Sequence, residues 1–230
     1  MKDIVHELED AFLPHKDTGK ALSMSRYMRN QFPFFGIPGP LRSSISKPYL
    51  QYFAHTNAKD LSICIRQLWE MPEREFQYFC IDAAMKAKKQ WQADFIEDIE
   101  YMITHKSWWD TVDALASTVT GKYLLRFPDQ KEYVIEKWRN SDHIWLIRSA
   151  LLFQLKYKEQ TDRHLLFSLV EQHAGHEDFF IRKAIGWALR EYAKSHPDEA
   201  LHFIRSTPLS PLSRREALKH FPDNEKVNRP

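Results

Sequence analysis

The sequence predicts an all-α fold in which helix pairs stack side by side as an α-α superhelix, or solenoid. Apolar residues recur with a helical period from one end of the chain to the other. Glycine is scarce, with six among 230 residues, which disfavours β-rich and dinucleotide-binding folds. A short motif also recurs at a spacing typical of helix-pair repeats. We expect one domain over residues 1–221 and a polar tail over residues 222–230.

In the N-terminal half, each expected helix follows an apolar stripe, and most begin at a capping residue or a proline. The expected helices run from Ile4 to Phe12, from Asp17 to Met28, from Leu41 with strain or an interruption at Pro48, from Asn57, from Pro72, and from Phe95 to Met102. Between the second and third helices, the segment Phe32–Pro40 holds three prolines and two glycines, which break helices. Its aromatic residues predict that this segment packs against the core.

The C-terminal half continues the same pattern. A helix is expected from Ser107 through Leu115, with Leu125 as its furthest end. Further helices are expected to open at Pro128, Ser141, Asp162, His176, Pro197 and Pro211.

The repeated motif reads Arg-x-Ala-apolar at the start of the second helix of a pair. It occurs in Ile147–Leu151, 34 residues later in Ile181–Ile185, and 33 residues after that in Arg214–Leu218. A small residue at a fixed place lets adjacent helices approach closely. In a solenoid the second helices line a concave face, and that face binds extended partners.

Composition excludes several classes of protein. The cysteines Cys64 and Cys80 lie in apolar helical patterns, which favours buried, reduced thiols. We expect no signal peptide, no membrane span and a cytoplasmic location, associated with the nucleoid when bound to DNA. The pair His173 and His176 lacks further ligands at metal-binding spacing, so we expect no metal and no cofactor.

The stretch from Lys106 to Asp113 carries the most informative chemistry. In a helix, Trp109 and Asp113 are four residues apart and share one face, where an indole ring lies one turn from a carboxylate. Such a pair can stabilise a cation. The alternative is structural, with Trp108 and Trp109 in the core and Ser107 in a capping box with Asp110.

Basic side chains share faces with these residues on the expected second helices. Residues 120–230 hold 19 Lys and Arg against 15 Asp and Glu, so this half is modestly basic. A groove that carries Lys and Arg along its length and Trp at its centre suits a nucleic acid backbone. For each cation alone, a solvated side chain is the favoured interpretation, and it is their position on a shared face that argues for a groove. The co-facial residues are Arg148 and Lys156 on one helix, and Lys183, Trp187, Arg190 and Lys194 on the next.

Four segments together resemble the AlkD-like DNA alkylation repair family, bacterial alkylpurine DNA glycosylases built from HEAT-like helical repeats. The similarity extends over the whole chain, from Tyr27 to Ala217. It departs from the family pattern at Pro38, where the family tends to have a polar residue, often Gln, facing the DNA. The segments that carry the resemblance are Lys106–Asp113, Trp145–Ala150, Phe153–Lys158 and Ile185–Lys194.

The resemblance implies excision of cationic N3-methyladenine and N7-methylguanine from duplex DNA without base flipping, as a step of base excision repair. It places Trp109, Asp113 and Trp187 in the catalytic set and Arg148 on the DNA backbone. We expect Lys156, Lys183, Arg190, Lys194 and Tyr27 to contact DNA as well, and a monomer to act on each lesion. The alternative is a non-catalytic HEAT-like module that binds DNA or protein.

Overall fold

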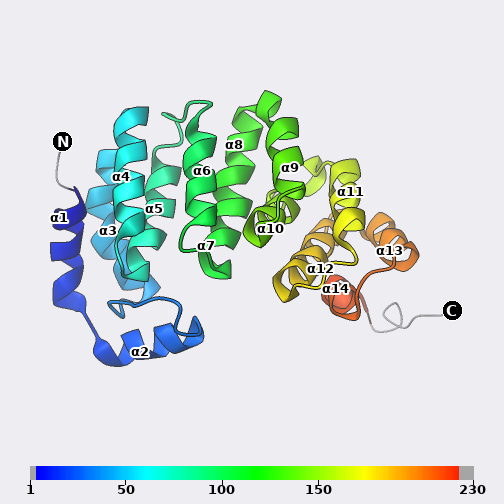
Figure 1. Ribbon diagram of the computed structural model, residues 1–230, viewed down its shortest axis with the longest axis horizontal. Helices are drawn as coiled ribbons and strands as arrows, with labels where there is room; N and C mark the ends of the chain where they lie inside the picture. Colours follow the sequence, from blue (N-terminus) through cyan, green and yellow to red (C-terminus); the bar gives the residue numbers. More distant parts are fainter. Residues whose placement is uncertain (1–3, 223–230) are drawn as a thin grey trace. The chain divides into compact units, whose positions relative to one another are not determined.

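A computed structural model of the protein describes residues 4–222, and the part described contains helices and loops but no strand (Figure 1). The all-α prediction is therefore confirmed. The helices form two compact units, residues 1–102 and 103–230. Within the described range, no helix is both long enough and apolar enough to cross a membrane. The expected single domain stays a prediction, and all but Pro222 of the expected tail lies outside the described residues.

The first unit contains six α-helices and one short 3-10 helix among its described residues, and the helices begin and end close to the predicted positions. Its elements are α1 (Ile4–Phe12), η1 (Leu13–His15), α2 (Thr18–Tyr27), α3 (Gly39–Phe53), α4 (Ala58–Glu70), α5 (Arg74–Lys86) and α6 (Phe95–Thr104), the last of which runs across the unit boundary. Of the two alternatives expected at Pro48, strain or interruption, the interruption is wrong, because α3 continues through this residue. Packing of α3 against α1 and α5 compensates for the hydrogen bond that proline cannot donate.

A buried carboxylate shapes the segment between α2 and α3. Glu75, on α5, accepts hydrogen bonds from the backbone N–H groups of Phe35, Gly36 and Ile37 at 3.1, 2.9 and 3.1 Å. Gly36 has a φ of +89°, which favours glycine, and a Cβ there would lie 2.2 Å from the carbonyl oxygen of Asp17. The segment is thus packed down on α5, as its aromatic composition predicted.

The second unit follows the helix pattern of the C-terminal half. Its elements are α7 (Trp109–Ala114), a π-helical turn η2 (Leu115–Thr120), α8 (Gly121–Arg126), η3 (Pro128–Gln130), α9 (Lys131–Arg139), α10 (Ile144–Leu152), η4 (Lys158–Gln160), α11 (Arg163–His173), α12 (Phe179–Ala193), α13 (Pro197–Ser206), α14 (Pro211–Ala217) and η5 (Leu218–His220). The predicted starts at Asp162 and Pro211 are correct to one residue, and Asp178 caps α12.

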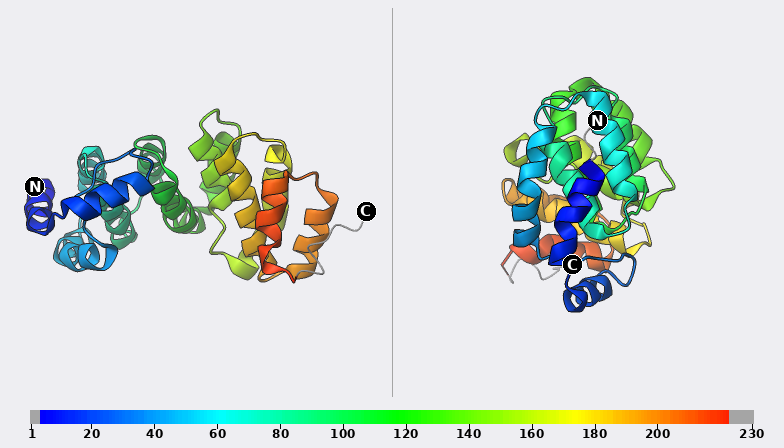
Figure 2. Two further views of the ribbon diagram at one scale, coloured as in Figure 1. Left: turned by 90° about the horizontal axis from the view of Figure 1, so that it is seen from below. Right: turned by 90° about the vertical axis from the view of Figure 1, so that its left-hand side faces the viewer.

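Helices α12 and α14 pack side by side, as the left view of Figure 2 shows. Gly186 makes this approach possible, because a Cβ at this position would lie 2.4 Å from the Cβ of Glu216 and 2.6 Å from the carbonyl oxygen of Ser213. The Ser213 hydroxyl donates to the carbonyl of Arg182 at 3.0 Å and ties the two helices together. This contact places one side chain of α14 beside the polar face of α12.

Candidate active site

One pocket of the second unit brings together most of the residues that the sequence singled out. Its volume is about 270 Å³, and residues of α7, α10, α12 and α14 line it. The lining combines aromatic rings, cations and two carboxylates. It consists of Trp109, Asp113, Arg148, Phe179, Phe180, Lys183, Trp187, Arg190 and Glu216.

The carboxylate of Asp113 is held by a bidentate ion pair. Arg148 donates from Nε to Oδ1 at 2.7 Å and from Nη2 to Oδ2 at 2.9 Å. The remaining terminal nitrogen, Nη1, donates to the carbonyl oxygen of Phe180, at the start of α12. The side chain of Arg148 is 5% exposed and that of Asp113 is 16% exposed. Arg148 therefore fixes the carboxylate while itself being fixed by a neighbouring helix.

Burial and charge act in opposite directions on Asp113. Burial raises the pKa of its carboxyl group above the ordinary 3.8, the hydrogen bonds and charge of Arg148 lower it, and the nearby Asp110 raises it, with a net upward shift. Both oxygens accept hydrogen bonds from a guanidinium group, so the ionised form is the one present at neutral pH. The pocket thus holds a desolvated anion with little freedom to reorient.

The tandem tryptophans have different environments. Trp108 is the N-cap residue of α7, in an extended conformation, and its ring packs against Trp145 and Phe180 with centroid distances of 5.8 and 5.2 Å. Trp109, the first residue of α7, lines the pocket. Trp108 thus packs in an aromatic cluster, as the structural alternative supposed, but it is half-buried and not part of the core. The alternative capping box does not form, because no side chain caps α7 and the Ser107 hydroxyl donates to the carbonyl of Ile103 instead.

A π-helical turn begins two residues after Asp113. Residues Leu115–Thr120 adopt it, and the Ser117 hydroxyl donates to the carbonyl oxygen of Asp113 at 2.7 Å. Single π turns inside α-helices are frequent at functional sites, because the extra residue changes which side chains share a face.

A second carboxylate in the pocket is surrounded by cations. Glu216 accepts from Lys183 Nζ at 2.9 Å, from Lys219 Nζ at 2.7 Å and from Arg190 Nη1 at 3.3 Å. Burial raises the pKa of Glu216, but hydrogen bonds and charge from Lys219 and Lys183 outweigh it and lower the pKa to about 2. Glu216 is therefore ionised at neutral pH.

Comparison with known proteins identifies the family of this chain. The sequence model of the DNA alkylation repair enzyme family matches residues 8–221. The chain belongs to this family. Among solved structures it is similar to a predicted DNA alkylation repair enzyme from Enterococcus faecalis, with 32% identity and a TM-score of 0.86 over 90% of this chain and 97% of that one. No curated protein matches the chain.

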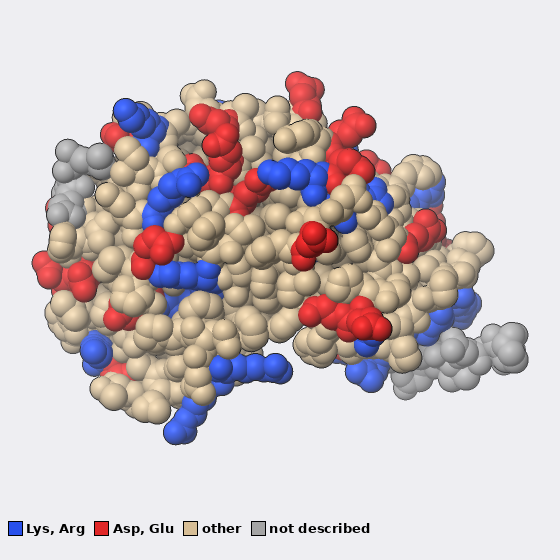
Figure 3. Space-filling model, viewed as in Figure 1, with Lys and Arg blue, Asp and Glu red and all other residues tan. Residues whose placement is uncertain are grey.

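Membership of the DNA alkylation repair enzyme family confirms the resemblance noted in the sequence and supports an enzymatic role in alkylation repair on DNA. The likeness to the solved structure also agrees with the predicted α-α superhelix of helix pairs. Figure 3 shows Lys and Arg interspersed with Asp and Glu over the face in view, without one dominant sign of charge. The net charge, which is only +2, likewise indicates no particular binding partner.

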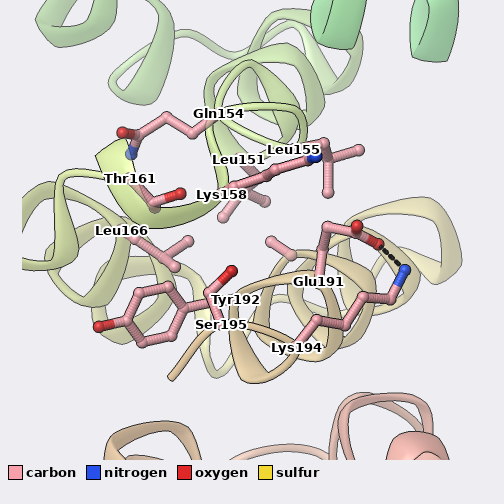
Figure 4. Close-up of a pocket in the computed structure, with 11 residues that line it drawn as sticks. Leu151, Gln154, Leu155, Lys158, Thr161, Leu166, Glu191, Tyr192, Lys194 and Ser195 are labelled. Atoms are coloured by element: carbon pink, nitrogen blue, oxygen red, sulfur yellow. Dashed lines mark hydrogen bonds and ion pairs between the residues drawn. The ribbon is translucent and has the colours of Figure 1, made fainter. Parts of the chain in front are cut away.

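Three of the predicted DNA-binding residues lie outside the pocket. Lys156 donates to the Thr118 hydroxyl at 2.5 Å. Lys194 pairs with Glu191 at 2.7 Å, at the edge of a smaller cavity of about 120 Å³ (Figure 4). Tyr27, on α2 of the first unit, is 71% exposed. Their predicted roles stay predictions.

Three pocket residues were not predicted from the sequence. Phe179 and Phe180 begin α12, and Phe179 is 52% exposed beside the pocket. Glu216 arrives from α14. A usable signal existed for Glu216, since Gly186 in the middle of a helix indicates that another element approaches closely there. Within residues 4–222, no group of three or more His, Cys, Asp or Glu could hold a metal ion.

Proposed function

We propose that the protein is a monofunctional DNA glycosylase that excises cationic alkylated purines, chiefly N3-methyladenine and N7-methylguanine, from duplex DNA. The observation that carries this proposal is the desolvated Asp113 carboxylate, held by Arg148 in a pocket that two indole rings also line. Such an anion suits a reaction that develops positive charge on a sugar. The family's role in alkylation repair agrees with this chemistry.

Asp113 acts on the deoxyribose. When the bond between C1′ and the purine nitrogen breaks, its electron pair leaves with the purine, which becomes neutral, and C1′ becomes oxocarbenium-like. The carboxylate stabilises this cation, as the carboxylates of glycoside hydrolases do. It also orients a water molecule, which adds to C1′ and gives up its proton to the carboxylate. The product is an abasic deoxyribose and a free base.

Trp109 and Trp187 supply aromatic faces to the same cation. An indole face attracts a cation by about 0.5–2 kcal/mol, and more strongly where water is excluded. Because this attraction grows as charge develops on the sugar, it stabilises the transition state more than the bound substrate. The two rings thus add to the effect of Asp113 without taking part in bond making.

Neither carboxylate of the pocket serves as a general acid, which restricts the substrate. Asp113 is ionised through its pairing with Arg148, and the pKa of Glu216 is about 2. Neither group can protonate a leaving purine at neutral pH. A purine alkylated at N3 or N7 already carries a positive charge and leaves without protonation, whereas an ordinary purine does not. The chemistry of the pocket therefore favours cationic lesions.

DNA is held by the cations at the edge of the pocket. We assign phosphate contacts to Lys183 and Arg190, whose side chains are 36% and 26% exposed. Arg148, Lys156 and Lys194 extend this contact with the DNA backbone through the N–H groups that their bonds within the protein do not use. The pocket receives the deoxyribose while the lesion stays stacked, so no base is flipped.

The experiment that tests the proposal measures free 7-methylguanine and 3-methyladenine released from methylated duplex DNA. The expected result is release well above the spontaneous rate, leaving abasic sites with unbroken strands. Strand cleavage at those sites would contradict a monofunctional enzyme. Tight duplex binding with release at only the spontaneous rate would instead favour the alternative, a helical module that binds DNA without catalysis.

A further inference from the structure

Glu216 is almost enclosed, although it belongs to the wall of an open pocket. Its side chain is 7% exposed, and three cationic side chains surround the carboxylate. Lys183 bonds to Oε1, whereas Lys219 and Arg190 both bond to Oε2. A single carboxylate therefore sets the position of cations that would otherwise repel one another.

The packing of α14 on α12 builds this arrangement. Lys183, Gly186 and Arg190 lie three and four residues apart, on one face of α12. Because Gly186 has no Cβ, the Cβ of Glu216 occupies the space between the two cations. The backbone carbonyl of Glu216 also lies 3.5 Å from Arg190 Nη1. The carboxylate is thus a fixed part of the helix contact and not a surface side chain that happens to meet a lysine.

The cations keep the capacity to bind a second anion. An ammonium group has three N–H donors and a guanidinium group has five, of which Glu216 takes only a few. Three cations and one carboxylate leave the cluster two positive charges in excess. Lys183 and Arg190 are partly exposed and line the same pocket as Trp187 and Asp113. A phosphodiester suits the position beside Lys183 and Arg190, because it carries one negative charge and its oxygens accept several hydrogen bonds.

We infer that Glu216 is a positioning residue, which holds Lys183 and Arg190 so that together they grip one backbone phosphodiester beside the pocket. This inference rests on the proposed function, since it specifies how that site holds its DNA. Glu216 touches neither the lesion nor the sugar. It acts only through the two cations that it orders.

Two roles for Glu216 predict opposite signs when its charge is removed. If the carboxylate merely adds negative charge near DNA, Glu216→Gln removes a repulsion and tightens duplex binding. If it positions the cations, the same substitution frees Lys183 and Arg190, which then bind phosphate less well although both remain present. Duplex binding should then weaken. Its dependence on salt concentration should also become shallower, because the protein neutralises fewer DNA phosphates when Lys183 and Arg190 no longer hold one.

The test measures binding of undamaged duplex DNA across a range of salt concentrations for the wild type and Glu216→Gln. Glu199→Gln is the matched control, since Glu199 is an ion-paired carboxylate of the same unit, bonded to Arg163 and Tyr192 outside the pocket. We expect Glu216→Gln to bind about 10-fold more weakly near 0.1 M salt, with a logarithmic salt slope smaller by about one. Glu199→Gln should match the wild type.

Two further variants complete the test. In a background of Lys183→Gln with Arg190→Gln, adding Glu216→Gln should change affinity little, because the groups it positions are gone. Glu216→Asp keeps the charge but withdraws the carboxylate by one methylene, so it should also reduce the logarithmic salt slope of duplex binding. This variant replaces Glu216→Gln in the test if Glu216→Gln does not fold. Unchanged or tighter binding in the folded Glu216 variants, or a wild type that does not bind duplex, would overturn the inference. Base release is measured separately, so a chain that releases no base yet shows these slopes would refute only the glycosylase.

Discussion

Arg148 donates two parallel hydrogen bonds to the two carboxylate oxygens of Asp113, across the contact between α10 and α7. The same guanidinium group also bonds to the carbonyl oxygen of Phe180, so three segments of the second unit meet at one side chain. This relationship orients the carboxylate and keeps it ionised in a place where burial favours the neutral form.

Arg148→Met should shift the pH dependence of base release. Burial already raises the pKa of Asp113, and removing the guanidinium group removes the main effect that opposes it. Activity needs the ionised carboxylate, so it rises with pH through this pKa. The midpoint of the single-turnover profile should therefore move upward relative to the wild type.

The matched control for this shift is Arg139→Met, which removes an arginine of the same unit that bonds to Ser168 outside the pocket. Its midpoint should equal that of the wild type. A lower rate in Arg148→Met with an unmoved midpoint would mean that Arg148 serves only to bind DNA.

Trp108 and Trp109 should separate into a stability residue and a catalytic residue. Trp108→Ala removes a ring packed on Trp145 and Phe180 and should lower the free energy of unfolding by about 3 kcal/mol. Trp109→Phe keeps an aromatic ring in the pocket but weakens its attraction for a cation, and should slow base release about 3- to 10-fold. Denaturant unfolding and single-turnover kinetics of both variants check this. Equal effects of the two substitutions on both measurements would contradict the division.

Glu75→Gln should destabilise the first unit, which does not contain the pocket. The carboxylate accepts three backbone N–H groups of the segment before α3, and an amide has only one accepting oxygen for them. At least one buried N–H then lacks a partner, which costs about 2–3 kcal/mol. The neighbouring Glu73→Gln, at the N-cap of α5 where no side-chain capping bond forms, should change stability by less than about 0.5 kcal/mol. Urea unfolding of both variants measures the difference.

Glu216 should give the protein a stability that depends on pH. Its folded pKa of about 2 lies below the ordinary 4.5, so its contribution is fully present above pH 4.5 and is lost as the pH falls toward 2. The wild type should exceed Glu216→Gln by about 2–3 kcal/mol in free energy of unfolding at neutral pH, and this difference should shrink in acid. A difference that stays constant with pH would show that packing, and not charge, is what the substitution removes.

The sequence predicts local features of this protein well and long-range ones poorly. Helical periodicity and caps predict where most helices begin, because these depend on neighbouring residues. The spacing of Trp109 and Asp113 likewise predicts that they share a face. The ion pair between Asp113 and Arg148 joins residues 35 positions apart, and the partners of Glu216 depend on how α14 packs on α12. Neither contact follows from a local pattern, and the π turn after Asp113 is also absent from the periodicity.

The central claim, that Asp113 stabilises charge on the sugar, is tested most directly by Asp113→Asn. This substitution keeps the shape of the side chain and removes its charge. We predict that single-turnover release of 7-methylguanine falls by about 10²–10³-fold, while the affinity for duplex DNA changes little. Release that stays within a few-fold of the wild type, or that falls only in proportion to lost DNA binding, would contradict the account.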